Sequence, residues 1–80
     1  MGYHLTTIPK GTLGEISKIE EEFLELKDAS YQCNKVLCIC ELCDLVGAIE
    51  AYAKQFNLKI DDLALMANAT KRAFEDGTRN

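Results

Sequence analysis

The chain has few of the features that common functional classes require. It has no tryptophan, a single proline and a single histidine among its 80 residues. It contains no glycine-rich P-loop ending in Lys-Ser/Thr, no dinucleotide-binding fingerprint, and no serine or cysteine with a histidine partner in view. It also has no run of about 18 apolar residues, the length that a membrane-spanning helix needs. P-loop nucleotidases, Rossmann enzymes, triad hydrolases and membrane proteins are therefore not indicated.

Positive charge is scarce as well. Lysine and arginine total 9 against 13 acidic residues, which gives a net charge of −4 and a pI near 4.8. Proteins that bind a phosphate backbone need a basic stripe, so nucleic acid is not an expected partner. The first residues, 1–5, carry neither the basic nor the apolar region of a signal peptide. We expect a cytoplasmic protein with no membrane partner.

The apolar content is high for so short a chain. Hydrophobic residues make up 48% of the sequence, yet 80 residues can form only one small domain with a thin core. We expect residues 1–80 to form one domain and the surplus apolar surface to be covered by self-association, as a homodimer or homotetramer.

Four cysteines cluster in the middle of the chain, at Cys33, Cys38, Cys40 and Cys43. Cys40 and Cys43 have the spacing of half a zinc site. On a helix, however, Cys38 and Cys40 point about 160° apart, so all four cannot bind one ion. We interpret them as buried free thiols in a reducing compartment.

Hydrophobic periodicity predicts an all-α chain of three helices. Residues 1–11 lack a helical period and contain the only proline, so they are predicted to form an extended arm in which His4 is solvated. The first helix is predicted to begin at Thr12, where Thr12 and Glu15 have the spacing of a capping box. Its expected apolar stripe is Leu13, Ile16, Ile19, Phe23 and Leu26.

Turn-forming residues at 28–34 should end that helix. A second helix is predicted over about 35–56, with a stripe of Ile39, Leu42, Val46, Ile49, Ala53 and Phe56, and with Asn57 as its C-cap. Asp61 is predicted to cap a third helix that ends at Gly77. The stripe of the third helix is Leu63, Met66, Ala67, Thr70, Ala73 and Phe74.

The central feature is a pair of acidic motifs, Glu22/Glu25 on the first helix and Glu41/Asp44 on the second. Residues three apart are neighbours on one helical face. Both Glu25/Glu41 and Glu22/Asp44 are centred on position 33, so a hairpin that turns near Cys33 would bring four carboxylates together. Such a cluster is unfavourable unless a cation neutralises it, and Mg²⁺ or Mn²⁺ are the hard ions that oxygen ligands favour. The alternative is an ordinary solvated acidic face.

Other residues have two interpretations each. Lys10 precedes the first helix and is either solvated or available to a phosphate. The polar side of the third helix and the residues just past it carry Asn68, Lys71, Arg72 and Arg79. In one interpretation these residues bind substrate. In the other, the cations among them stabilise the helix C-terminus. Gly47, one turn after Asp44, leaves room either for a ligand or for a close helix crossing.

The order Glu21-Glu22-x-x-Glu25, then Glu41-x-x-Asp44, resembles the all-α nucleoside triphosphate pyrophosphatase superfamily, which includes MazG-type enzymes, dimeric dUTPases and phosphoribosyl-ATP pyrophosphatase. The resemblance extends from Ile8 to Phe74 and is to short single-domain MazG-like proteins of phages and bacteria. It implies an oligomeric bundle of the four-helix type, made by two or more chains.

The resemblance also implies an activity, Mg²⁺-dependent hydrolysis of a nucleotide between the α and β phosphates. The implied metal ligands are Glu22, Glu25, Glu41 and Asp44, and Glu21 has a supporting role. Glu22 or Glu25 would act as the catalytic base. The resemblance implies that Lys71 binds substrate, with Asn68, Arg72 and Arg79 as further candidates. Lys10 is a candidate because of its position just before the first helix. The alternatives are a nucleotide-binding module without catalysis and a plain helical oligomerisation domain.

Overall fold

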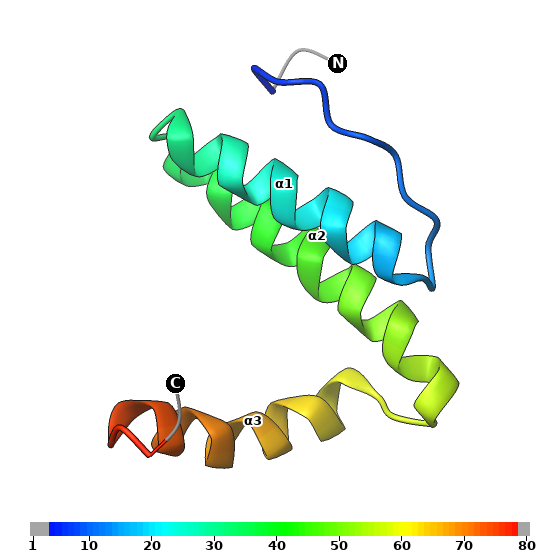
Figure 1. Cartoon of the computed structure of the whole chain (residues 1–80), viewed down its shortest axis with the longest axis vertical. Coiled ribbons are helices and arrows are strands. Elements are labelled where there is room, and N and C mark those ends of the chain that lie inside the picture. Colours follow the sequence, from blue (N-terminus) through cyan, green and yellow to red (C-terminus); the bar gives the residue numbers. More distant parts are fainter. Residues whose placement is uncertain (1–3, 79–80) are drawn as a thin grey trace.

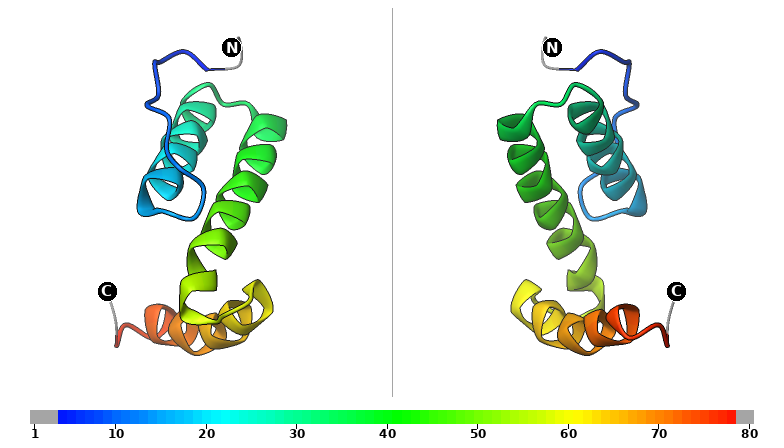
Figure 2. Two further views of the ribbon diagram at one scale, coloured as in Figure 1. Left: turned by 90° about the vertical axis from the view of Figure 1, so that its right-hand side faces the viewer. Right: turned by 90° about the vertical axis from the view of Figure 1, so that its left-hand side faces the viewer.

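The computed structural model describes residues 4–78, and every regular element in that range is helical (Figure 1). Helix α1 spans Ile16–Tyr31, α2 spans Lys35–Ala53, the 3-10 turn η1 spans Lys54–Phe56, and α3 spans Ile60–Glu75. The all-α prediction is confirmed. Helices α1 and α2 lie side by side as an antiparallel hairpin, and α3 crosses the far end of α2 (Figures 1 and 2).

The hairpin turns at the position that the sequence predicted. Cys33 adopts a left-handed conformation with φ 56°, and its N–H donates to the Ser30 carbonyl at 3.0 Å. The N–H of Asn34 donates to the Ala29 carbonyl at 3.3 Å, which completes a Schellman motif at the end of α1. Asn34 then caps α2, because its side-chain oxygen accepts from the N–H of Leu37 at 3.0 Å. Backbone groups at the end of α1 and at the start of α2 thus find hydrogen-bond partners within a few residues of the turn.

The predicted start of α1 is wrong. The helix begins at Ile16 with Glu15 as its N-cap, and no side chain caps it, so Thr12 and Glu15 form no capping box. Gly14 explains the difference: its φ of 95° lies outside the range of a right-handed helix, and the chain instead makes a turn in which Glu15 N–H donates to the Thr12 carbonyl.

The predicted cap of α3 is displaced in the same way. Lys59, and not Asp61, is the N-cap, and Asp62 accepts a hydrogen bond from the Lys59 N–H at 2.8 Å. The other boundaries agree with expectation. Asn57 is left-handed at φ 59° and ends the 3-10 extension of α2, and Gly77, with φ 80°, follows the end of α3.

The faces that α1 and α2 turn toward each other carry acidic residues and alanines. This differs from the predicted apolar stripes. The buried residues of the described chain are Glu21, Glu22, Asp28, Ala29, Glu41, Ala48 and Ala53. Phe23 on α1 and Ile39, Leu42 and Val46 on α2 are instead exposed. Much of the expected apolar stripes therefore faces outward, although Ala53 of the α2 stripe is buried. Helix α3 has no buried residue.

Residues 4–12 form no helix or strand and run back along α1, from the hairpin turn toward the start of the helix (Figure 1). Two backbone N–H groups of this arm donate to carboxylates of α1. Leu5 N–H donates to Asp28 at 2.9 Å, and Gly11 N–H donates to Glu21 at 2.8 Å. The remainder of the predicted arm, residues 1–3, lies outside the described residues.

All four cysteines are free, but the prediction that they are buried is wrong for the single chain. Cys33, Cys40 and Cys43 are exposed and Cys38 is half-buried. Cys33 lies in the hairpin turn, and the other three lie on α2. Within residues 4–78, no helix has the length and apolar character that crossing a membrane requires.

Candidate metal centre

The hairpin brings the two acidic motifs together. Each of Glu22, Glu25, Glu41 and Asp44 offers one carboxylate oxygen, and these four oxygens all lie within 4.8 Å of one another. Ligand atoms around an octahedral ion with bonds of about 2.1 Å lie roughly 3–4 Å apart, so the cluster has the size of one coordination sphere. We refer to these four residues as the quartet.

Two oxygen atoms of the quartet need a partner. Within the described chain, Glu22 Oε1 and Glu41 Oε1 are the buried side-chain oxygen or nitrogen atoms without a hydrogen-bond partner. The two side chains are only 7% and 6% exposed. An unsatisfied buried carboxylate oxygen is costly, and a cation between the helices would satisfy both. The donor set therefore fits a hard divalent ion.

Glu25 shows the electrostatic strain of the cluster. Burial, the charge of Glu22 and its neighbours Glu21 and Glu41 raise its pKa from 4.5 to about 7. A cation would act in the opposite direction, because an opposite charge at this distance favours the ionised carboxylate. The pKa of about 7 therefore describes Glu25 without a cation in the quartet.

Glu21 lies beside the quartet but has another role. Its Oε1 accepts from Gly11 N–H at 2.8 Å and from Lys18 Nζ at 3.1 Å. The Gly11 hydrogen bond and the Lys18 ammonium outweigh burial and lower the pKa of Glu21. Lys18 also contacts Glu22 at 3.1 Å, and both contacts raise the pKa of Lys18. Glu21 therefore fixes the arm to α1.

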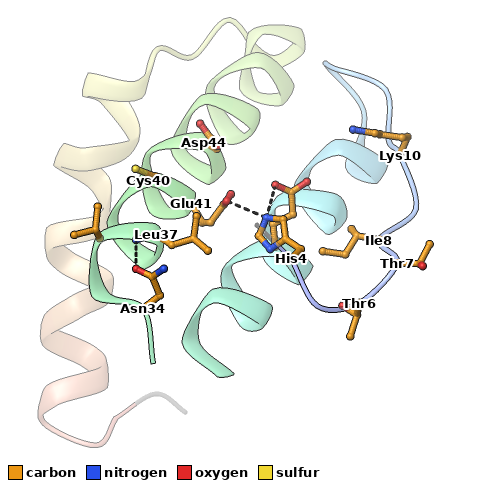
Figure 3. Close-up of a pocket in the computed structure, with 12 residues that line it drawn as sticks. His4, Thr6, Thr7, Ile8, Lys10, Asn34, Leu37, Cys40, Glu41 and Asp44 are labelled. Atoms are coloured by element: carbon orange, nitrogen blue, oxygen red, sulfur yellow. Dashed lines mark hydrogen bonds and ion pairs between the residues drawn. The ribbon is translucent and has the colours of Figure 1, made fainter. Parts of the chain in front are cut away.

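Two residues at the centre were not predicted from the sequence. The prediction that His4 is solvated is wrong. Its Nδ1 lies 2.8 Å from Asp28 Oδ2, and its Nε2 lies 3.5 Å from Glu25 Oε1. Figure 3 shows the third contact, of Nε2 with Glu41 Oε2 at 3.1 Å. Burial opposes the charged ring, but the Asp28 hydrogen bond and the Glu41 and Glu25 charges raise the pKa of His4 above 6.5.

Asp28 received no functional assignment from the sequence, because it lies in a turn-rich segment. It is buried, and its pKa is lowered despite burial by hydrogen bonds from Leu5 N–H, His4 and Gln32. The available signal was its spacing: Asp28 follows Glu25 by three residues and so continues the acidic face of α1 by one turn.

An open cavity of about 820 Å³ adjoins the quartet, between the arm, α1 and the first half of α2. Its lining includes Glu25, Glu41 and Asp44 together with His4 and Lys10 from the arm (Figure 3). Lys10 is 88% exposed and lies 3.9 Å from Glu21, so its ammonium remains available to an anion. The volume is in the range of small-molecule sites.

The predicted substrate residues of α3 do not line this cavity. Asn68, Lys71 and Arg72 are exposed on a helix that lies away from the hairpin (Figure 2). Lys71 Nζ instead lies 4.0 Å from Glu75 on the same helix. Arg79 lies outside the described residues. Of the two interpretations of Lys71 and Arg72, the single chain therefore leaves only that they stabilise their own helix, because neither lines the cavity.

Gly47 does not mark a close helix crossing within this chain. A Cβ atom built on it meets no other atom within 4 Å. Open space therefore lies beside α2 one turn beyond Asp44.

Comparisons with protein-family models, with curated proteins and with solved structures found no match to this chain.

Proposed function

We propose that the chain is a divalent-cation-dependent nucleotide pyrophosphohydrolase, which cleaves a nucleoside triphosphate or related nucleotide between the α and β phosphates to a monophosphate and pyrophosphate. The observation that carries the proposal is the quartet with its two unpartnered buried oxygens. Four carboxylates that converge on one point, two of them with an unpartnered buried oxygen, match an Mg²⁺ or Mn²⁺ site, and such ions commonly serve phosphate chemistry. The sequence resemblance to MazG-like proteins supports the same assignment.

The roles of the residues follow from their environment. When bound, Mg²⁺ would screen the phosphate charge and act as a Lewis acid. The quartet would hold it. Glu25, which is 18% exposed and lines the cavity, is placed to take a proton from an attacking water molecule. Lys10 on the arm is the ammonium that faces the cavity and would stabilise negative charge on the phosphates.

The complete site is proposed to need a second copy of the chain. Asn68, Lys71 and Arg72 lie too far along α3 to line the cavity of their own hairpin, but α3 of a neighbouring copy would supply them. The outward apolar face of α2 supports such an assembly.

The direct test is to incubate the protein with NTPs, dNTPs and phosphoribosyl-ATP, in the presence of Mg²⁺ or Mn²⁺, and to resolve the products. We expect a monophosphate and pyrophosphate in equal amounts. Orthophosphate as the only product, or no turnover with either ion, would contradict the proposal. Unchanged nucleotide recovered from a tight complex would instead indicate a binding module without catalysis.

A matched pair of variants connects activity to the quartet. Glu41→Gln with Asp44→Asn removes two anionic ligands and should abolish both Mg²⁺ binding and turnover. Glu50→Gln, at an exposed position of the same helix, changes one charge outside the quartet and should leave both unchanged. An equal loss of turnover in the two variants would show that activity does not depend on the quartet.

A further inference from the structure

His4 comes to the quartet from outside the hairpin. It is separated from Glu25 and Glu41 by 21 and 37 residues, yet its Nε2 lies 3.5 Å and 3.1 Å from their carboxylate oxygens. The ring is only 16% exposed. His4, Glu25 and Glu41 form a second group whose ligand atoms all lie within 4.8 Å of one another.

Asp28 determines which ring nitrogen faces the carboxylates. Its Oδ2 accepts from Leu5 N–H at 2.9 Å and from Gln32 Nε2 at 3.1 Å, so it is held in place independently of the ring. The third contact, 2.8 Å to His4 Nδ1, therefore places a proton on Nδ1. When the imidazole is neutral, Nε2 is then an acceptor that points at Glu25 and Glu41.

We infer that His4 Nε2 is a nitrogen ligand of the cation held by the quartet, with Asp28 as the residue that positions the ring. The inference rests on the proposed function, because it assumes that a cation binds there. Without a cation, Nε2 meets these two carboxylates favourably only when it carries a proton, and a bound cation would take the place of that proton. Adjacent ligands of an octahedral ion with bonds of about 2.1 Å lie about 3 Å apart, close to the observed separations. A histidine whose other nitrogen donates to a carboxylate is a common arrangement at metal sites.

A nitrogen ligand changes which ion the site prefers. Four carboxylates alone suit Mg²⁺, whereas imidazole binds first-row transition ions more strongly. We therefore expect the site to prefer Mn²⁺, and by the same chemistry Fe²⁺ or Co²⁺, over Mg²⁺. The preference should depend on His4.

The experiment uses the untagged full chain with Mn²⁺ as the probe. Pulsed electron paramagnetic resonance detects nitrogen nuclei bound directly to Mn²⁺, and the sequence has only one histidine, so an imidazole signal is attributable to His4. We expect imidazole nitrogen modulation in the bound Mn²⁺ spectrum. Bound Mn²⁺ without this signal would overturn the inference and leave the carboxylate site intact. No bound Mn²⁺ at all would overturn the proposed function as well.

His4→Asn is the matched variant. The asparagine amide can still donate to Asp28 and keep the arm in place, but it has no atom at the position of Nε2. We expect the imidazole signal to vanish and Mn²⁺ affinity to fall about tenfold or more, with a smaller change for Mg²⁺. A signal that persists in this variant, or equal losses for the two ions, would contradict the assignment.

Discussion

The charge of Glu25 depends on what occupies the space between α1 and α2. Burial and the neighbouring carboxylates raise its pKa from 4.5 to about 7, and the pKa of His4, in contact with it, is also raised. Both groups therefore bind protons more strongly in the folded chain than in the unfolded chain. A divalent cation would replace those protons, so metal binding and protonation compete at this site.

This competition predicts the pH dependence of the metal-free protein. Between pH 4.5 and about 7 the folded state holds more protons at Glu25 than the unfolded state does, so stability should fall as pH rises through that range. His4 acts in the same direction as pH rises through its raised pKa. Thermal unfolding in chelator from pH 5 to pH 8 should show a falling Tm. Saturating Mg²⁺ or Mn²⁺ should remove most of the fall, and an unchanged slope would argue against a cation in the quartet.

Glu25→Gln should reproduce the protonated state permanently. At pH 8 without metal, we expect stabilisation of about 1 kcal/mol, or roughly 4–8 °C in Tm, because one repelling charge is removed. The same variant should lose most of its stabilisation by Mg²⁺ and should not hydrolyse nucleotides. Glu20→Gln, at an exposed position of α1 outside the quartet, is the control and should behave as the wild type. Destabilisation of Glu25→Gln in chelator would mean that the quartet tolerates its charge without a cation.

The hairpin turn is the element on which the site depends, because it sets the register between Glu25 and Glu41. The turn has one local cost. Cys33 is left-handed at φ 56°, a conformation that costs a residue with a Cβ atom about 1 kcal/mol or more and that glycine adopts freely.

Cys33→Gly should therefore stabilise the chain by about 1 kcal/mol and leave cation binding unchanged. Cys33→Ala removes the same thiol but keeps the Cβ atom, so it should give no such gain. Urea unfolding of the three proteins measures the differences. Equal effects of glycine and alanine would indicate that the thiol, and not the backbone conformation, sets the stability of the turn.

The turn and the quartet could be predicted from the sequence because both depend on local spacing. Glu22/Glu25 and Glu41/Asp44 are symmetric about position 33, and helix geometry converts that symmetry into proximity. Helix starts were less predictable. Gly14, with its φ of 95°, delays the start of α1. At the start of α3, Asp62 and not the predicted Asp61 accepts a hydrogen bond from the N-cap residue, Lys59. A threonine or aspartate of the right spacing indicated each start but did not determine it.

The part played by the arm could not be predicted. His4 lies in a segment without periodicity, and its contacts with Asp28 and Glu41 span 24 and 37 residues. No pattern in one sequence encodes such contacts. Whether each apolar stripe faces inward or outward could not be predicted either, because periodicity identifies a face of a helix but not what covers it.

The whole molecule, taken as a single chain, leaves much of its apolar surface uncovered. The buried apolar residues of the described chain are three alanines, whereas Val36, Ile39, Leu42 and Val46 along α2 are between 47% and 72% exposed. Ile39, Leu42 and Val46 recur at helical spacing and form one outward stripe, whereas Val36 lines the cavity. Exposed apolar stripes of this kind mark interaction surfaces, and a thin core of this size is rarely sufficient for a small domain. We therefore expect a second copy of the chain to cover the α2 stripe.

Leu42→Glu tests this expectation, because it places a charge in the middle of the stripe and should prevent a second copy from packing there. We expect the wild type to sediment as a dimer or tetramer of the 8.9 kDa chain, and the variant as a monomer of reduced stability. Gln55→Glu adds the same charge at an exposed position beyond the stripe, and should leave the assembly intact. If α3 of a neighbouring copy supplies Lys71 to the cavity, Leu42→Glu should also lose hydrolysis while the quartet still binds Mn²⁺. A wild type that sediments as a monomer would contradict both the expected self-association and the supply of Lys71 by a neighbouring copy.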